Sequence, residues 1–336
     1  MSFTLAELDS ATELVRRSIP PTPTHRWPLL CEALGAEVWV KHENHTPTGA
    51  FKVRGGLVYV DRLLRERPHI KGLVSATRGN HGQSIAFAGR AAGLPVTICV
   101  PFGNSPDKNA AMRGFGAELI EAGHDYQAAR EHAASVARER QYEFVPPFHP
   151  DLVLGVATYA RELFDAVGEL DVVYVPVGMG SGAGGVIGVR DLLGLPTEVV
   201  GVVSELAPAS ALSFAAGVVV ATDSADTFVD GVACRVPDTD AIATLVAGAA
   251  RVITVSEDAT AEAMRLLFAA THNAPEPAGA IALAGAVAER ERIAGARVAV
   301  IQTGGNVDSA LFAQVLRGAT PTVEHDPRGV ELGQLA

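Results

Sequence analysis

Short apolar runs rich in valine and isoleucine alternate along this chain with alanine-rich stretches whose apolar positions recur at helical spacing. Such runs are typical of strands buried on both faces, and the stretches between them can form crossover helices. The alternation therefore predicts an α/β protein with mostly parallel sheets. We expect strands over residues 37–42, 72–75, 95–100, 172–177, 198–203, 251–255 and 297–302, with helices such as 83–92, 126–140 and 260–270 between them.

A proline-rich stretch at residues 144–150, Phe-Val-Pro-Pro-Phe-His-Pro, interrupts this alternation. Each proline lacks a backbone donor and restricts the residue before it. The chain has 336 residues and is 48% hydrophobic, which is long for one simple domain and sufficient for two cores. We therefore expect two lobes, each a mostly parallel twisted sheet flanked by helices. The large domain would comprise residues 1–65 and 147–336, and the small domain residues 66–146.

Composition narrows the class of partner. The formal net charge is −11 and no basic block is present, so nucleic acid and anionic membrane surfaces are poor candidates. No apolar run is long enough to cross a bilayer, and the first twenty residues carry charges that a secretory signal lacks. Cys31, Cys99 and Cys234 lie far apart and are odd in number, which predicts ordinary thiols. These features favour a cytoplasmic enzyme that acts on small molecules.

Lys52 is the first candidate for chemistry. It follows the turn-rich segment Thr-Gly-Ala-Phe at residues 48–51. Most lysines are solvated surface charges, but apolar surroundings would lower the pKa of this amine toward the neutral form that reacts with a carbonyl group. The segment therefore suits a carbonyl cofactor.

Three further segments place a glycine-rich turn after a predicted strand. Gly-Asn-His-Gly at residues 79–82 would present backbone N–H groups and an asparagine side chain at a helix N-terminus, as an anion receptor does. Gly-Met-Gly-Ser-Gly at residues 178–182 would let backbone amides surround a phosphate. Thr-Gly-Gly-Asn at residues 303–306 follows a third strand, and ligands of open α/β sheets gather at such strand ends.

The second of these turns permits a different cofactor. Gly180, Gly182 and Gly185 have the spacing G-x-G-x-x-G, and Glu205 closes the next strand about twenty residues on, as in a dinucleotide-binding unit. A nicotinamide (NAD-dependent) dehydrogenase is therefore an alternative prediction. It assigns no role to Lys52 or to the turn at residues 79–82.

Taken in chain order, the four segments resemble the pyridoxal-phosphate enzymes of the tryptophan-synthase-like fold, specifically the serine/threonine dehydratase and serine racemase group. The resemblance covers roughly residues 22–316. It implies that the large domain binds pyridoxal 5'-phosphate, that the substrate is an amino acid and that the chain forms a homodimer.

The resemblance also implies roles for individual residues. Lys52 would carry the cofactor covalently, Asn80 would bond its phenolic oxygen and Thr303 its pyridine nitrogen. The cofactor-binding residues would be Phe51, Lys52, Asn80, Gly178, Met179, Gly180, Ser181, Gly182 and Thr303. The substrate-binding residues would be Thr77, Arg78, Asn80, His81 and Gln83, with Thr77 and the amides of Asn80 and His81 receiving the substrate carboxylate. Two weaker echoes of the family, at residues 230–233 and 276–280, would line or brace the site.

The implied reaction is dehydrative deamination of a β-hydroxy amino acid such as threonine or serine. Lys52 removes the α-proton, hydroxide leaves from the β-carbon with a proton from the cofactor phosphate, and hydrolysis yields a 2-oxo acid and ammonia. The Thr303 hydroxyl would leave the ring nitrogen unprotonated, which favours elimination. An inactive family member used for binding is another alternative, although the intact Lys52, Asn80 and Thr303 argue against it.

Three departures from the family pattern matter. Serine racemases have a serine base before Gly-Asn-His-Gly, where this chain has Arg78, and a guanidinium is a poor proton shuttle. Racemisation is thus less favoured than dehydration. Arg78 would instead bind a second anionic group, such as the distal carboxylate of a 3-hydroxyaspartate, or form a structural ion pair at the lobe boundary.

The second departure concerns metal. Metal-dependent members carry a carboxylate pair after the strand that ends at Glu205, and its later position here is Ala211, so we expect no tightly bound divalent ion. His42 and His45 also lack a third ligand at zinc-like spacing. The third departure is the pair Met179 and Ser181 among the glycines of residues 178–182, which with Arg78 indicates a substrate other than plain threonine.

Overall fold

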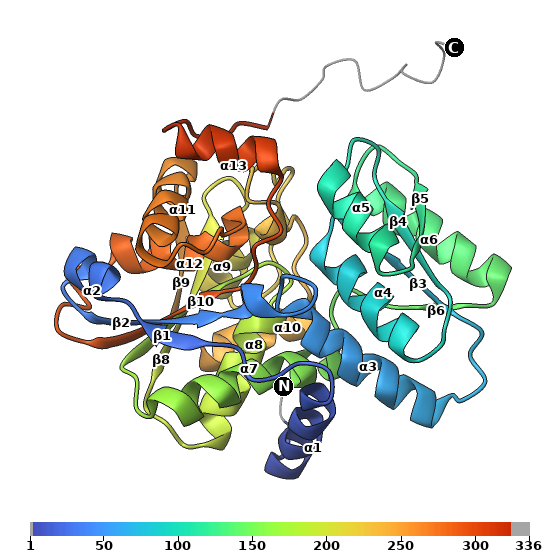
Figure 1. Cartoon of the computed structure of the whole chain (residues 1–336), viewed down its shortest axis with the longest axis horizontal. Coiled ribbons are helices and arrows are strands. Elements are labelled where there is room, and N and C mark those ends of the chain that lie inside the picture. Colours follow the sequence, from blue (N-terminus) through green and yellow to red (C-terminus); the bar gives the residue numbers. More distant parts are fainter. Residues whose placement is uncertain (1–2, 324–336) are drawn as a thin grey trace.

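Two sheets carry the fold, and they lie in separate lobes of the computed structural model, which describes residues 3–323 (Figure 1). The larger sheet has the strand order β1-β2-β10-β7-β8-β9 and the smaller one the order β5-β4-β3-β6. Every pair is parallel except β1 with β2. The larger sheet comprises β1 (Thr24–Arg26), β2 (Glu37–His42), β7 (Val172–Pro176), β8 (Glu198–Ser204), β9 (Arg251–Val255) and β10 (Arg297–Gln302). The smaller sheet comprises β3 (Leu73–Ala76), β4 (Val96–Val100), β5 (Glu118–Glu121) and β6 (Glu143–Phe144).

The predicted fold class is confirmed, and each of the seven expected strands forms within one residue of its expected bounds. The three strands that the pattern missed, β1, β5 and β6, are all edge strands. None of their residues is fully buried, so none of them carries an apolar run. Hydrophobic patterning finds strands that are covered on both faces and overlooks those that are not.

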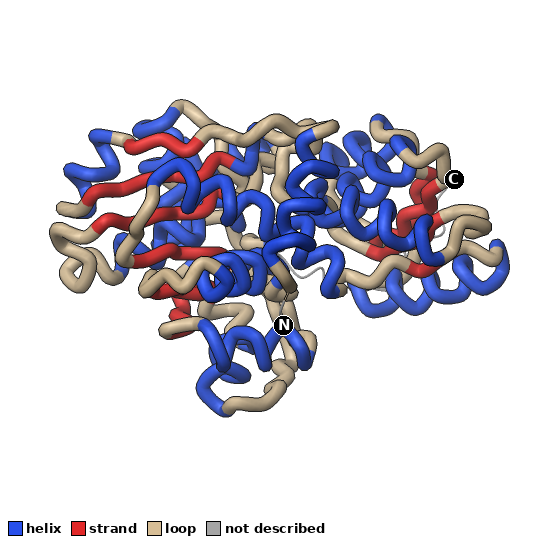
Figure 2. The backbone as a smooth tube through the Cα atoms, turned by 90° about the horizontal axis from the view of Figure 1, so that it is seen from below, coloured by secondary structure: helices blue, strands red, loops and turns tan. Residues whose placement is uncertain are grey.

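Helices cover both faces of each sheet, as the view from below shows (Figure 2). In the large lobe α7 and α8 pack on one face, and α11 and α12 on the other. In the small lobe α4 and α5 cover one face and α6 the other. The helices are α1 (Leu5–Arg16), α2 (Pro28–Leu34), α3 (Lys52–Glu66), α4 (Asn80–Ala91), α5 (Pro106–Gly114), α6 (Tyr126–Arg140), α7 (Pro150–Val167), α8 (Ser181–Leu192), α9 (Ala209–Ala216), α10 (Thr239–Gly248), α11 (Glu257–Thr271), α12 (Pro277–Ala288) and α13 (Ser309–Leu316), with short 3-10 turns η1 (Glu43–His45) and η2 (Asp230–Val232).

Two expected helices begin earlier than predicted. The helix expected over residues 260–270 begins three residues earlier, as α11 at Glu257. The helix expected over residues 83–92 begins three residues earlier, as α4 at Asn80. The Gly-Asn-His-Gly segment therefore belongs mostly to the first turn of the helix, and its N–H groups are those that a helix leaves unpaired. The four strands of the smaller sheet all fall within residues 66–146, while the division into domains at residues 65 and 147 stays a prediction.

Helix α3 joins the two lobes, and its glycines make this possible. It packs against α4 of the small lobe and α7 of the large lobe. A Cβ atom on Gly55 would lie 2.7 Å from the Leu152 carbonyl oxygen, and one on Gly56 would lie 2.3 Å from the Ser84 hydroxyl oxygen. The Gly-Gly pair after Lys52 thus lets α3 approach both neighbours closely, which places its first residue at the lobe boundary.

A fully buried ion cluster fixes the start of α3 in the large lobe. The Arg54 guanidinium lies 2.7 Å from the Glu43 carboxylate and 2.9 Å from that of Glu162, which also accepts from the Lys41 ammonium at 2.7 Å. We call Lys41, Glu43, Arg54 and Glu162 the buried cluster. Its two positive and two negative charges compensate one another away from water, as buried ions require.

Within residues 3–323 no helix combines the length and the apolar character that a membrane span needs.

Candidate active site

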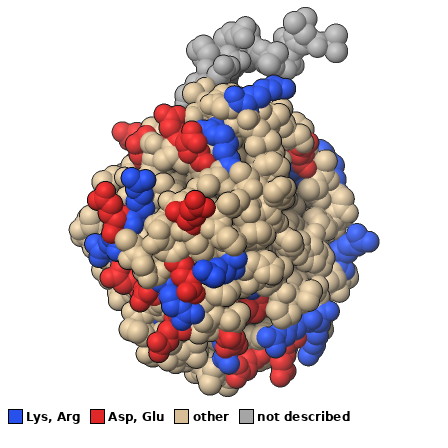
Figure 3. Space-filling model, turned by 60° about the vertical axis from the view of Figure 1, so that its left-hand side comes forward, with Lys and Arg blue, Asp and Glu red and all other residues tan. Residues whose placement is uncertain are grey.

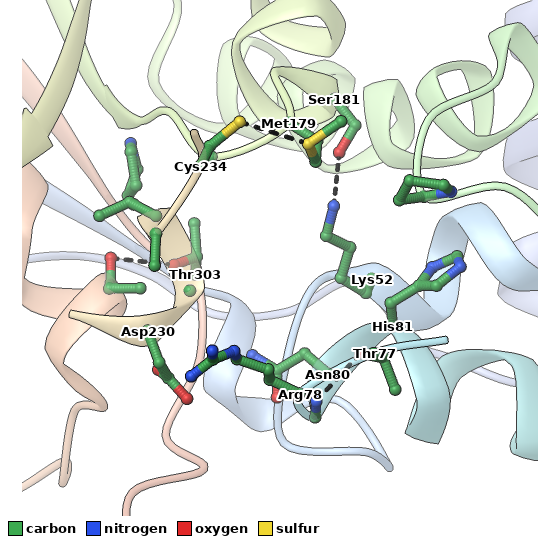
Figure 4. A pocket seen from close by; sticks show the side chains of 18 of the residues that line it. Lys52, Thr77, Arg78, Asn80, His81, Met179, Ser181, Asp230, Cys234 and Thr303 are labelled. Atoms are coloured by element: carbon green, nitrogen blue, oxygen red, sulfur yellow. Dashed lines mark hydrogen bonds between the residues drawn. The ribbon is translucent and has the colours of Figure 1, made fainter. Parts of the chain in front are cut away.

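A cavity of about 170 Å³ opens between the lobes. Its walls include Thr77 after β3, Gly178 after β7 and Thr303 after β10, so it lies at the carboxyl ends of strands from both sheets. Figure 4 shows the Thr77 and Thr303 side chains on the walls of one space. All predicted site residues except Gln83 line this cavity: Phe51, Lys52, Thr77, Arg78, Asn80, His81, Gly178, Met179, Gly180, Ser181, Gly182 and Thr303.

Lys52 is the first residue of α3 and points across the cavity (Figure 4). Its Nζ donates a hydrogen bond of 2.9 Å to Ser181 Oγ and lies 5.0 Å from the centre of the Phe51 ring. Burial lowers the pKa of Lys52 to about 8, because an ammonium loses hydration there. A substantial fraction of this amine is therefore neutral near physiological pH, as a nucleophile or base requires.

The glycine-rich turn at residues 178–182 has the geometry of an anion receptor. Gly180 adopts a left-handed conformation with φ of 89°, which glycine tolerates best. A Cβ on Gly178 would lie 2.5 Å from the Gly231 carbonyl oxygen, so a side chain there would displace the neighbouring loop. The turn ends at Ser181, where the twelve-residue helix α8 begins with unpaired N–H groups. A phosphate fits this position.

The small lobe supplies a second helix start. Thr77 Oγ1 accepts a 3.0 Å hydrogen bond from the Gly79 backbone N–H, which holds the turn before α4. Burial and the positive charge of Lys52 lower the pKa of His81 to about 3, so its ring is neutral. Its Nε2 has no partner in the described part of the chain. Gln83 is buried one turn into α4, away from the cavity wall.

The large lobe closes the remaining walls. Thr303 Oγ1 donates to the Ala278 carbonyl oxygen at 3.2 Å. The Cys234 thiol lies 3.5 Å from the Met179 sulfur (Figure 4), and burial raises the pKa of Cys234 to about 11, so the thiol stays protonated. The three cysteines are free, as predicted, since no disulfide joins them.

Arg78 is exposed and reaches along the cavity mouth on the side of Asp230 (Figure 4). No ion pair of Arg78 is formed within residues 3–323. The structural ion pair considered as an alternative is therefore absent from the described residues, and Arg78 lines the cavity as an exposed side chain.

Sequence reasoning missed several wall residues or placed them only loosely, and four of these have polar side chains that bear on the site. Lys108 and Tyr126 were not predicted, while Asp230 and Glu276 were expected only to line or brace the site. Lys108 is in the first turn of α5, after β4, so its position beyond a strand end was the available indication. Its Nζ pairs with Asp230 Oδ2 and lies 4.0 Å from Glu276 Oε2, both on the opposite lobe.

The other cofactor and metal hypotheses gain no support from the geometry. Glu205 is exposed at the end of β8 and does not line the cavity, so the dinucleotide alternative lacks its acidic partner. His42 uses both ring nitrogens, accepting from Trp27 Nε1 at 3.0 Å and lying 2.8 Å from Gln302 Oε1. Among the described residues no group of three or more histidine, cysteine or acidic side chains could hold a metal ion.

A buried lysine with a lowered pKa and two glycine-rich turns, each at the start of a helix, surround a single cavity between two parallel α/β lobes. This combination defines an enzyme that uses a phosphorylated carbonyl cofactor. A family profile described as pyridoxal-phosphate dependent enzyme matches residues 15–304. The chain belongs to this family, and its cofactor is pyridoxal phosphate.

Individual relatives agree with this assignment. The chain is 29% identical to L-threo-3-hydroxyaspartate ammonia-lyase from Saccharomyces cerevisiae, covering 94% of this chain and 97% of the relative. It is 32% identical to beta-hydroxyaspartate dehydratase from Paracoccus denitrificans, with 91% and 96% covered. Its structure resembles the processed form of threonine deaminase isoform 2 from Solanum lycopersicum with a TM-score of 0.86 and 26% identity, over 94% of each chain. These similarities support a lyase.

The residues present fit the cofactor. The cavity is lined by the Lys52 amine, whose pKa is lowered, and by Gly178 and Gly180, where a Cβ atom would clash with neighbouring atoms. It is also lined by His81, whose buried Nε2 has no partner among the described residues. Lys52 would hold the carbonyl carbon, and the turn at residues 178–182 would hold the phosphate.

Proposed function

We propose that this enzyme is an ammonia-lyase that converts a β-hydroxy amino acid into a 2-oxo acid and ammonia by α,β-elimination. The observation that carries the proposal is the Lys52 amine, which lies with its pKa lowered to about 8 beside the phosphate-binding turn and opposite the start of α4. A base at this position must be neutral to accept a proton, and the lowered pKa makes that form accessible at working pH.

Different residues would bind the substrate and transfer the proton. When bound, pyridoxal phosphate withdraws electrons from the α-carbon of an attached amino acid. Thr77 and the backbone amides at the start of α4 bind the substrate carboxylate, and Lys52 Nζ takes the α-proton. The β-hydroxyl then leaves as water with one added proton. The resulting enamine takes up one water and releases ammonia, so the net change is loss of ammonia alone.

The preferred substrate has a second carboxylate, and 3-hydroxyaspartate is the candidate. Arg78 supports this choice because its guanidinium lines the cavity and forms no ion pair in the described chain. Guanidinium groups bind carboxylates through paired hydrogen bonds. Two of the relatives bear names that specify hydroxyaspartate.

The experiment that tests the proposal is a visible absorption spectrum of the purified enzyme, followed by additions of L-threonine, L-serine and 3-hydroxyaspartate with 2-oxo acid and ammonia assayed in each. We expect cofactor absorbance and the fastest turnover with 3-hydroxyaspartate. The Lys52→Ala variant should keep its fold and lose both absorbance and turnover. Cofactor absorbance without ammonia from any of the three substrates would contradict the reaction, and inversion of an amino acid without ammonia would favour a racemase.

We further propose that the enzyme works in the cytoplasm as a homodimer and does not bind nucleic acid. The three free thiols and the net charge of −11 support this setting. Figure 3 shows acidic and basic side chains interspersed on one face, where a nucleic-acid site would gather basic ones. Sedimentation at several protein concentrations would test the dimer, and a monomer at all of them would contradict it.

A further inference from the structure

The orientation of the Asn80 side chain follows from its neighbours. Asn306 Nδ2 donates to the Thr48 carbonyl oxygen at 2.8 Å, and of the two polar atoms of an asparagine side chain only the nitrogen can donate. The same nitrogen lies 2.8 Å from Asn80, so the atom of Asn80 that faces it is the acceptor Oδ1. Asn80 Nδ2 must then face the other way, where it donates to Glu276 Oε1 at 2.7 Å.

One N–H of Asn80 Nδ2 therefore belongs to Glu276. An amide nitrogen carries two hydrogens, and Asn80 lines the cavity. The second N–H is the one available to an acceptor there, such as the phenolic oxygen that the family resemblance assigns to it. Asn306 holds the oxygen side of the Asn80 amide and Glu276 holds the nitrogen side, so the two residues together fix the direction of this donor.

The chain holds the Glu276 carboxylate firmly in place. Glu276 immediately precedes α12, and its backbone N–H donates to the Gly304 carbonyl oxygen at 3.1 Å. A Cβ on Gly304 would lie 2.1 Å from Glu276 Oε1, so the late glycine-rich turn leaves room for this carboxylate and for nothing larger. The Glu276 side chain is 1% exposed.

The contacts of Glu276 cross from one lobe to the other. Asn80 on α4 and Lys108 on α5 belong to the small lobe, whereas Glu276 and Asp230 belong to the large lobe. Glu276 Oε2 lies 4.0 Å from Lys108 Nζ and has no hydrogen-bond partner in the described part of the chain. The carboxyl group thus has one satisfied oxygen and one oxygen that a proton or a closer Lys108 could occupy.

We propose that Glu276 is a positioning residue: its carboxyl group orients the Asn80 amide toward the cofactor, and its charge state governs how firmly the small lobe closes over the cavity. Burial raises the pKa of Glu276 to about 7, Lys108 and the Asn80 hydrogen bond oppose that rise, and Asp230 adds to it. The group therefore changes charge near neutral pH. The only part that rests on the proposed function is the assignment of pyridoxal phosphate chemistry to Asn80.

Four variants separate the two roles in the purified holoenzyme. Glu276→Gln keeps a side-chain oxygen that can accept from Asn80 but removes the charge. Glu276→Asp keeps the charge on a side chain too short to contact Asn80, and Glu276→Ala removes both the oxygen and the charge. Glu289→Gln, beyond the other end of the same helix, is the matched control because its partners Arg251 and Tyr174 lie outside the cavity. The readouts are the dissociation constant of pyridoxal phosphate, the pH dependence of cofactor absorbance, and hydrogen exchange at the starts of α4 and α5.

We expect cofactor to bind the Asp and Ala variants roughly tenfold more weakly, with the Gln variant close to wild type. Cofactor absorbance should change with pH, with a midpoint near pH 7, in the wild-type enzyme, in Glu276→Asp and in the control variant. It should show no such change in Glu276→Gln and Glu276→Ala. Exchange at the starts of α4 and α5 should be fastest in Ala. Equal affinities and midpoints in all variants, or the same changes in the control, would overturn the proposal. Because no readout uses turnover, failure of the proposed reaction would not imitate this result.

Discussion

Two buried glutamates of this protein have pKa values shifted in opposite directions. Burial alone would raise the pKa of Glu162, but the hydrogen bonds and charges of Arg54 and Lys41 lower it below its usual value. Burial also raises the pKa of Glu276, and there a more distant Lys108 fails to reverse the effect. Two buried carboxyl groups thus differ in pKa because one is surrounded by closely paired cations and the other is not.

The difference lies in how completely each carboxylate is paired. In the buried cluster both oxygens of Glu162 accept hydrogen bonds. We call Asn80, Lys108, Asp230 and Glu276 the cavity cluster. In it Glu276 Oε2 and Asp230 Oδ1 have no partner within the described residues. Saturated pairing suits a group that holds the fold, and incomplete pairing leaves capacity for a ligand or a proton.

The largest effect should come from breaking the buried cluster. Arg54→Met keeps much of the side-chain volume but leaves the buried carboxylates of Glu43 and Glu162 without the guanidinium that pairs with them. We expect a loss of about 3–5 kcal/mol in the free energy of unfolding, because unpaired buried charges cost that much. Urea denaturation followed by circular dichroism would measure it.

The matched substitution in the cavity cluster is Lys108→Met. It should cost less than half as much, since the Asp230 side chain is 28% exposed to water and Glu276 can hold a proton. Equal losses in the two variants would remove the distinction between a cluster that supports the fold and one that serves the site.

The second effect concerns pH and Glu276. Because its pKa is raised from 4.5 to about 7 in the folded protein, the folded state holds this proton more tightly than the unfolded state. The stability that it contributes is complete below pH 4.5 and falls as the pH rises to about 7. Glu276→Gln removes this dependence. Relative to wild type, its unfolding free energy should therefore rise by on the order of 2–3 kcal/mol between pH 4.5 and 7 and stay level above.

Urea denaturation of the two proteins at several pH values measures that difference. A flat difference across the whole range would mean that Glu276 stays ionised in the folded state. It would then match Glu162, and the contrast between the clusters would fail.

Sequence reasoning succeeded where local pattern determines position. The residues of the three glycine-rich turns follow strands whose apolar runs are unambiguous, so their common location at strand ends could be predicted. Lys52 was instead singled out by the turn-rich segment before it. Sequence reasoning failed for Lys108, whose role depends on α5 of one lobe meeting η2 and α12 of the other. Such a meeting joins residues over a hundred positions apart, and no periodicity in the chain records it.

The pairing of charges was equally hidden. Arg54 stands two residues after Lys52 in the sequence, yet it lies in the buried cluster rather than in the cavity. The sequence allowed two roles for Arg78, a structural ion pair or a contact with the substrate. The described part of the structure provides no ion pair for it. Both outcomes depend on which acidic groups the fold brings within a few ångströms, which a single sequence does not reveal.

The third effect is on substrate choice. Arg78→Ala should lower kcat/KM for 3-hydroxyaspartate roughly tenfold or more, because a charge-assisted hydrogen bond to the second carboxylate is lost. Serine has no such carboxylate, so its kcat/KM should change by less than about threefold. Steady-state assays with both substrates test this, with Arg113→Ala as a control that removes an exposed arginine elsewhere in the small lobe. Parallel losses for both substrates would assign Arg78 to general positioning.

The smallest effect should come from Ser181→Ala. The variant removes the oxygen that accepts from Lys52 Nζ, but the turn at residues 178–182, which we propose holds the phosphate, keeps its backbone N–H groups and its glycines. Backbone donors at the start of α8 are expected to supply most of the phosphate affinity. Cofactor affinity should therefore fall only about threefold, while Ser213→Ala, a buried serine outside the cavity, should not change it. A loss of roughly a hundredfold or more in equilibrium titrations with pyridoxal phosphate would show that the hydroxyl, and not the backbone of the turn, holds the cofactor.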